Sequence, residues 1–192
     1  MVHEAAEALL LGKSPDVDPL IRPAIQAFID FLERTEVVTR PEFVERRIVN
    51  KDHRYAGTID ALVTMNGKFG VLDIKTSQAI YRDYTLQTSA YMDALTEQFP
   101  HLETRWILRL DQVQKCTNCP ATKRTKGGRE KVKNNNYPSY GAVCEEHAWQ
   151  ETEGVAELKE FPSWGEDFQA FLGAKKLWEW ENSEWLKRIG YL

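Results

Sequence analysis

The sequence has no hydrophobic run approaching the 18 residues that a membrane-spanning helix needs, and no signal peptide at its start. It also has only three cysteines, an odd number that favours metal binding over disulfide bonds in a protein that is not exported. Both features predict a cytoplasmic protein without a membrane partner. With 192 residues, 42% of them hydrophobic, the chain can form one sizeable core and a small inserted module.

The segment between positions 55 and 77, YAGTIDALVTMNGKFGVLDIKTS, predicts a β-hairpin. Asn66 and Gly67 stand between two runs rich in β-branched and aromatic residues, and this pair favours a two-residue type I′ turn with positive φ at both positions. Such a turn sets Met65 opposite Lys68. Every further pair along the two strands follows from that register.

The same register predicts that Asp60 lies directly opposite Asp73, with the Cβ atoms about 4.5–5.5 Å apart, where two like charges destabilise a sheet. Lys75 falls on the same face, because side chains alternate along a strand. This face could be an ordinary solvated surface with a chance ion pair. It could also be a site for a divalent cation, since two carboxylates suit Mg²⁺ and a nearby ammonium group could orient a water molecule.

The motif residues are Asp60, then Asp73-Ile74-Lys75, then Gln87 and Tyr91, which would share one face of a following helix. In this order they resemble the PD-(D/E)xK nucleases of the RecB type, a superfamily that includes CRISPR-associated adaptation nucleases and phage exonucleases. The resemblance implies that Asp60, Asp73 and the carbonyl of Ile74 bind Mg²⁺ or Mn²⁺. It also implies that Lys75 lies beside the attacking water, and that the substrate is DNA.

Many members of the superfamily also carry a histidine on an N-terminal helix as a metal ligand, and His3 is similar in position. The resemblance covers about the first 110 residues. It implies an α/β, restriction-endonuclease-like core with a central mixed β-sheet flanked by helices. If the chain is encoded by a phage, it would act in the host cytoplasm.

The rest of the sequence agrees with such an order of elements. Helices are expected at about 3–11, 18–34, 83–98 and 168–189, and strands outside the hairpin at about 42–50, 104–114 and 154–161. Glu45, in the first of these strands, could reach the metal from the neighbouring strand, but we expect it to be an ordinary exposed strand residue. The predicted domains are a nuclease core at 1–114, a zinc-binding insertion at 115–148, and a last strand and helix at 149–192.

The insertion contains all three cysteines of the chain, in the pairs Cys116-x-x-Cys119 and Cys144-x-x-His147. Two pairs of ligands with this spacing are typical of a structural Cys₃His zinc site, in which all four positions are filled. An iron–sulfur cluster is the alternative, since histidine can replace a cysteine ligand. The superfamily members that hold such a cluster usually have one cysteine before the nuclease core, and this chain has none there.

The insertion is also strongly basic. It contains seven Lys and Arg residues between positions 115 and 133 against one acid, a balance of +6, whereas the whole chain has a net charge of −4. These cations are Lys115, Lys123, Arg124, Lys126, Arg129, Lys131 and Lys133. A concentrated basic segment in an acidic protein indicates phosphate binding, and Tyr137 and Tyr140 could stack on bases. The alternative is a solvated lysine-rich loop.

Two functions therefore compete. The first is a metal-dependent deoxyribonuclease, acting in recombination, repair or phage DNA processing. The second is a non-catalytic nucleic-acid-binding protein that uses the zinc-stabilised basic loop. The complete set of Asp60, Asp73 and Lys75 favours the nuclease, because binding alone would not require it.

Overall fold

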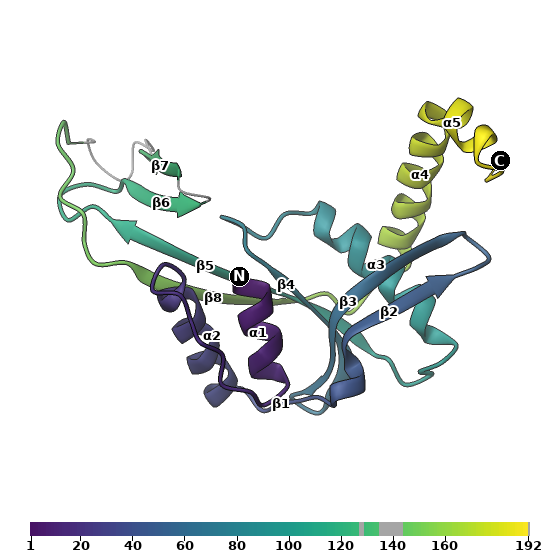
Figure 1. Ribbon diagram of the computed structural model, residues 1–192, viewed down its shortest axis with the longest axis horizontal. Helices are drawn as coiled ribbons and strands as arrows, with labels where there is room; N and C mark the ends of the chain where they lie inside the picture. The colour runs from purple at the N-terminus through teal and green to yellow at the C-terminus, as the bar shows by residue number, and fades with distance from the viewer. Residues whose placement is uncertain (127–128, 135–143, 192) are drawn as a thin grey trace. The chain divides into compact units, whose positions relative to one another are not determined.

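The computed structural model describes residues 1–126, 129–134 and 144–191 of the chain. It is an α/β structure with a mixed β-sheet flanked by helices (Figure 1). The chain divides into two compact units, which are described one at a time. The first consists of Met1–Glu36, Ile74–Ala79 and Leu108–Leu158, and the second of Val37–Asp73, Ile80–Ile107 and Lys159–Leu192. The restriction-endonuclease-like core and the predicted domain ranges stay predictions.

In the first unit, the helices α1 (Val2–Leu10) and α2 (Arg22–Arg34) lie side by side (Figure 1). Helix α2 begins four residues later than the sequence predicts, and Pro23 lies in its first turn, where a missing N–H costs no hydrogen bond. Gly154 allows a strand to approach this turn closely. A Cβ atom at that position would lie 1.8 Å from the carbonyl oxygen of Pro23.

The strands of the first unit are antiparallel where the register is defined. Strand β5 (Thr104–Lys115) belongs to this unit from Leu108 onward. It pairs with β6 (Thr122–Lys126), which pairs with β7 (Arg129–Lys133), and β8 (Glu153–Glu160), which belongs to this unit as far as Leu158, also pairs with β5. The basic segment is therefore a two-stranded ribbon, although the sequence suggested a loop. The predicted strands at 104–114 and 154–161 are both present.

In the second unit, β3 (Tyr55–Met65) is the central strand. It pairs with β4 (Lys68–Lys75) on one side and with β1 (Val37–Val38) and β2 (Val44–Asn50) on the other, and a 3₁₀ helix, η1 (Pro41–Phe43), precedes β2. The predicted turn is confirmed, since φ is 52° at Asn66 and 77° at Gly67. The predicted register is confirmed from Met65 opposite Lys68 to Leu62 opposite Val71.

The helices α3 (Asp83–Thr96), α4 (Gly165–Glu181) and α5 (Ser183–Arg188) belong to the second unit. Helix α3 packs against α4 (Figure 1). Its inner residues Met92 and Leu95 are fully buried against Ile59, Leu62 and Val71 of the hairpin. This packing fixes the face of α3 that looks toward the sheet, and therefore the position of Tyr91.

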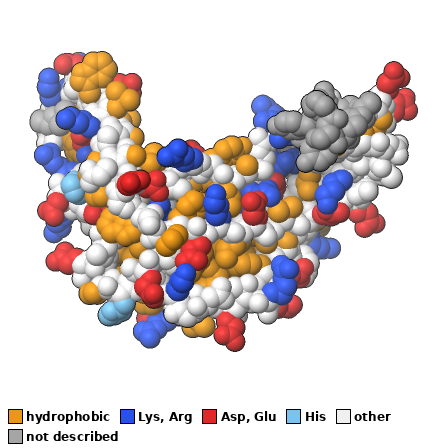
Figure 2. Space-filling model, turned by 180° about the vertical axis from the view of Figure 1, so that it is seen from behind, with side chains coloured by type: hydrophobic (Ala, Val, Ile, Leu, Met, Phe, Trp, Pro, Cys, Tyr) orange, Lys and Arg blue, Asp and Glu red, His pale blue; other side chains and the backbone are white. Residues whose placement is uncertain are grey.

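Hydrophobic side chains gather over the C-terminal helices on the face drawn in Figure 2. Trp180 of α4 and Trp185 of α5 are exposed at 73% and 55%. None of the helices in the described part of the chain combines the length and the apolar character needed to cross a membrane.

Candidate active site and metal cluster

Three carboxylates lie at one level across three neighbouring strands of the second unit. Glu45 stands between the pairs Val44–Ala61 and Arg46–Ile59, so it neighbours Asp60 of β3. Continued by one residue, the register of the hairpin sets Asp60 opposite Asp73 of β4. We call Glu45, Asp60 and Asp73 the acidic row. Asp73 is almost completely buried at 2% exposure, Asp60 is half-buried and Glu45 is exposed, as the sequence predicted.

The negative charges of the acidic row affect the pKa of Tyr91. Burial of the phenol, followed by the negative charges of Asp73, Asp60 and Glu45, raises the pKa of Tyr91 well above its ordinary value, against a smaller lowering by the hydrogen bond from Gln87. The Nε2 atom of Gln87 donates that bond to the Tyr91 hydroxyl over 2.7 Å. The helix α3 thus holds the two predicted motif residues together, facing the acidic row.

Gly57 of β3 makes room for the ring of Tyr91. A Cβ atom at Gly57 would lie 3.0 Å from Cε1 of Tyr91, tighter than ordinary van der Waals contact. The close approach of α3 to the sheet at this point therefore depends on the absence of a side chain on β3.

In the first unit, His3 and Ile74 meet although they are 71 residues apart in sequence. The Nε2 atom of His3 lies 2.7 Å from the carbonyl oxygen of Ile74, close enough for Nε2–H to donate a hydrogen bond. Lys75 follows directly as the last residue of β4 and is half-buried. Two ligands of one octahedral Mg²⁺ ion lie about 3 Å apart, so the His3–Ile74 pair also fits adjacent positions around such an ion.

The Cys/His cluster, formed by Cys116, Cys119, Cys144 and His147, is assembled in the first unit, with all ligand atoms within 4.8 Å of one another. The Sγ atom of Cys144 lies 3.6 Å from that of Cys116 and 3.4 Å from that of Cys119. Nδ1 of His147 lies 3.4 Å from Cys119 Sγ and 3.3 Å from Cys144 Sγ. Ligands of tetrahedral Zn²⁺ are about 3.4–3.8 Å apart, so the arrangement fits a structural zinc site.

The surroundings of Cys116 favour the thiolate form of its side chain. Burial opposes the charge on Cys116, but the hydrogen bond from the N–H of Asn118, at 3.4 Å, and those from His147 and the other thiols outweigh it and lower the pKa of Cys116 to about 6. The thiolate is the form that binds metal.

The indole of Trp149 connects the cluster to the basic ribbon. Trp149 forms a β-bridge with Cys116, and its ring lies 4.7 Å from that of His147. The ammonium group of Lys123 lies over the same indole at 5.3 Å and also pairs with Glu130 at 3.3 Å. Lys123, which the sequence assigned to phosphate binding, therefore packs on the cluster.

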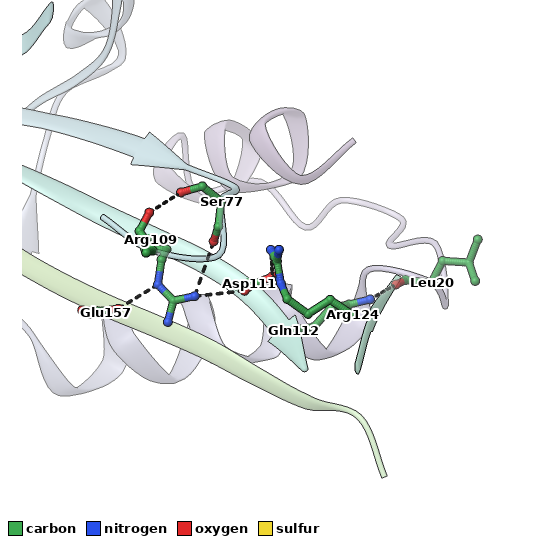
Figure 3. A network of polar contacts seen from close by, with 8 residues as sticks. Leu20, Ser77, Arg109, Asp111, Gln112, Arg124 and Glu157 are labelled. Atoms are coloured by element: carbon green, nitrogen blue, oxygen red, sulfur yellow. Dashed lines mark hydrogen bonds and ion pairs between the residues drawn. The ribbon is translucent and has the colours of Figure 1, made fainter. Parts of the chain in front are cut away.

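The other face of the ribbon is fastened by the polar network in Figure 3. Arg124 donates two hydrogen bonds to Oδ1 of Asp111, at 2.5 and 3.0 Å, and Arg109 binds Oδ2 of the same carboxylate at 2.9 Å. Arg109 also donates to Glu157 at 2.7 Å and to the carbonyl of Ser77 at 3.4 Å. Arg124, a second predicted phosphate-binding residue, is thus held by an internal ion pair.

Three further cations of the ribbon lie on β7. Arg129, Lys131 and Lys133, which we call the basic row, occupy alternate positions and are exposed. The side chain of Lys126 lies outside the described residues, as do Tyr137 and Tyr140. Lys115 pairs with Glu153 at 2.5 Å at the surface.

A comparison of the sequence with models of known protein families found no match, and a comparison with curated proteins found none either. The resemblance to PD-(D/E)xK nucleases therefore stays a prediction that depends on the motif residues.

Sequence patterns did not predict the backbone conformation of Glu45 or the contacts of Asp111. Glu45 has φ of 50°, an uncommon value for a residue with a side chain, and such values often occur near functional sites. The motif FVERRIV gives no sign of that conformation. For Asp111, the only available signal was an isolated acid in the strand that leads into a strongly basic segment.

Proposed function

We propose that the protein is a metal-dependent deoxyribonuclease that hydrolyses phosphodiester bonds, acting from DNA ends. Asp60 and Asp73 would hold Mg²⁺ or Mn²⁺, with the carbonyl of Ile74 and the imidazole of His3 as further ligands. A bound ion of this kind polarises the phosphoryl group and lowers the pKa of a coordinated water.

The contact between His3 and Ile74 is the observation that best supports this proposal. The motif resemblance assigns both residues to one ion on the sequence alone, and their ligand atoms lie 2.7 Å apart. The two residues are 71 positions apart in sequence and belong to α1 and β4, so it is the fold that brings their ligand atoms together. The acidic row adds anionic ligands on adjacent strands, which a hard cation prefers.

The other motif residues have roles that follow from their chemistry. Lys75 follows Asp73 and Ile74 directly in β4, and its ammonium group would orient the attacking water and stabilise charge on the phosphoryl oxygens. Tyr91 is held by Gln87 and keeps its proton, because its pKa is raised. It can therefore donate a hydrogen bond to a phosphate oxygen.

The ribbon and the Cys/His cluster supply the second part of the proposal. A zinc ion bound to the four ligands would fold the segment that carries the basic row. The three exposed cations of that row would bind the DNA backbone in a sequence-independent manner. This arrangement also supports the alternative function, nucleic-acid binding without catalysis.

One experiment separates the two functions. Linear and covalently closed circular DNA, single- and double-stranded, is incubated with the protein in Mg²⁺, Mn²⁺ or EDTA. The nuclease requires cleavage of linear DNA in either metal, no cleavage in EDTA, and a rate at least a hundredfold lower in Asp73→Ala and Lys75→Ala. The exposed acid Asp52 supplies the matched control, Asp52→Ala. DNA binding without metal-dependent cleavage would establish the alternative function.

A further inference from the structure

A pocket of about 370 Å³ in the second unit is lined by residues of β3, α3 and α4. Two aromatic residues from different elements, Tyr55 of β3 and Phe171 of α4, form part of its wall. Leu86 and Ala90 of α3 add aliphatic surface, and Asp83 and Gln87 add polar groups on the same helix. The volume lies in the range of small-ligand sites, which are mostly apolar with a few polar groups.

The aromatic wall is held in place. The hydroxyl of Tyr55 donates to the carbonyl of Ala90 over 2.8 Å and lies 3.0 Å from a carboxylate oxygen of Asp93. The ring of Phe171 meets that of Tyr55 edge-to-face, with centroids 5.1 Å apart, and Phe168 stacks behind it at 6.1 Å. The pocket is therefore formed before any ligand arrives, and binding requires little ordering of side chains.

Tyr91 connects the pocket to the acidic row. It lines the pocket with Gln87 and with Gly57, which lies three residues before Asp60 in β3, and the negative charges of Asp73 and Asp60 act on its hydroxyl. A ligand in the pocket would therefore lie one side chain away from the carboxylates that we assign to catalysis. Among the described residues, the lining contains Asp83 and no Lys or Arg, so it suits an uncharged group better than a phosphate.

We propose that this pocket binds one unpaired nucleobase of the DNA strand whose backbone lies at the acidic row. The base would lie against Tyr55 and Phe171, and the Asp83 carboxylate or the Gln87 amide would bind its polar edge, as acidic and amide side chains do for exocyclic amino groups. This inference rests on the proposed nuclease function and adds to it a preference for a frayed or single-stranded end.

The test uses short single-stranded DNA in which one base at a time is replaced by an abasic site. Binding is measured by fluorescence anisotropy in Ca²⁺, and cleavage of the unmodified strand is measured in Mg²⁺. In the wild-type protein we expect one position at which base removal weakens binding about tenfold, the loss typical of one base–aromatic stack. Phe171→Leu should remove this position-dependent loss. Trp180→Leu, which changes an exposed aromatic of the same helix, should keep it.

Wild-type protein alone supplies a second measurement, in case Phe171→Leu does not fold. A 2-aminopurine at the sensitive position should lose fluorescence on binding, because stacking quenches it. If no single base removal weakens binding and cleavage is normal, the pocket proposal is overturned and the proposed nuclease function stands. Absence of cleavage and of binding would overturn the nuclease and the pocket together. A position-dependent loss that persists in Phe171→Leu would also overturn the pocket.

Discussion

The substitution Asp73→Asn should make the metal-free protein more stable and at the same time inactive. Asp73 is 2% exposed, and the hairpin register sets it opposite the half-buried Asp60. Two carboxylates about 5 Å apart repel each other by roughly 3 kcal/mol at an effective dielectric constant of about 20. Other interactions of the two carboxylates offset part of this repulsion, so the substitution should add about 1–2 kcal/mol to the free energy of unfolding.

Thermal unfolding in EDTA and in Mg²⁺ measures this effect. For a chain of this size, 1 kcal/mol shifts Tm by about 2–4 °C. In EDTA the variant should therefore unfold several degrees above the wild type. Mg²⁺ should raise the Tm of the wild type, because the ion binds only the folded state, and should raise that of the variant much less.

The control is Asp52→Asn, which removes an exposed carboxylate from the turn between β2 and β3. It should change neither Tm nor the response to Mg²⁺. A variant Asp73→Asn that is less stable than the wild type in EDTA would refute the assigned repulsion. Equal stabilisation of wild type and variant by Mg²⁺ would show that the ion binds elsewhere.

Three further predictions concern the rest of the chain. Protein purified without added metal should contain one zinc per chain by elemental analysis, and Cys119→Ser should lose it; iron with visible absorbance would contradict the assignment. Neutralising the basic row should reduce the slope of log affinity against log salt by about 0.9 for each phosphate of duplex DNA that the row no longer neutralises; an unchanged slope would mean that DNA binds elsewhere. Asp167→Ala should destabilise the protein by about 3–5 kcal/mol in urea unfolding, because it leaves the fully buried guanidinium of Arg105 without its carboxylate. The control, Glu166→Ala, changes the exposed neighbouring acid and should cost under about 0.5 kcal/mol. Equal effects of the two substitutions would contradict the role of Asp167.

The hairpin could be predicted in detail because its information is local. Asn66 and Gly67 adopt the positive φ values that a type I′ turn requires, and the turn fixes every pair that follows. The spacing of the Cys/His cluster was equally informative, since short knuckles constrain the positions of their own ligands. The start of α2 was less certain because helix ends depend on details such as Pro23.

The parts that could not be predicted depend on contacts between distant segments. The place of Glu45 in the acidic row is set by the alignment of β2 with β3 and by an unusual backbone conformation. Strands β6 and β7 lack the alternation of apolar and polar residues that marks a half-buried strand, so their pairing left no hydrophobic pattern. The pocket beside Tyr91 needs Phe171, which lies 80 positions further along the chain.

The number of charges in the sequence does not tell which cations hold the ribbon in place and which face outward. The reason is that side chains along β6 alternate between its two faces. Lys123 and Arg124 are neighbours in sequence, so their side chains leave the strand on opposite faces. One packs on Trp149 beside the Cys/His cluster, and the other binds Asp111 in the polar network. The ribbon is thus fastened on both faces through β6, whereas the cations of β7 remain exposed. Phosphate binding should therefore depend on β7 directly, and on the cluster and network only through the position that they give to the ribbon.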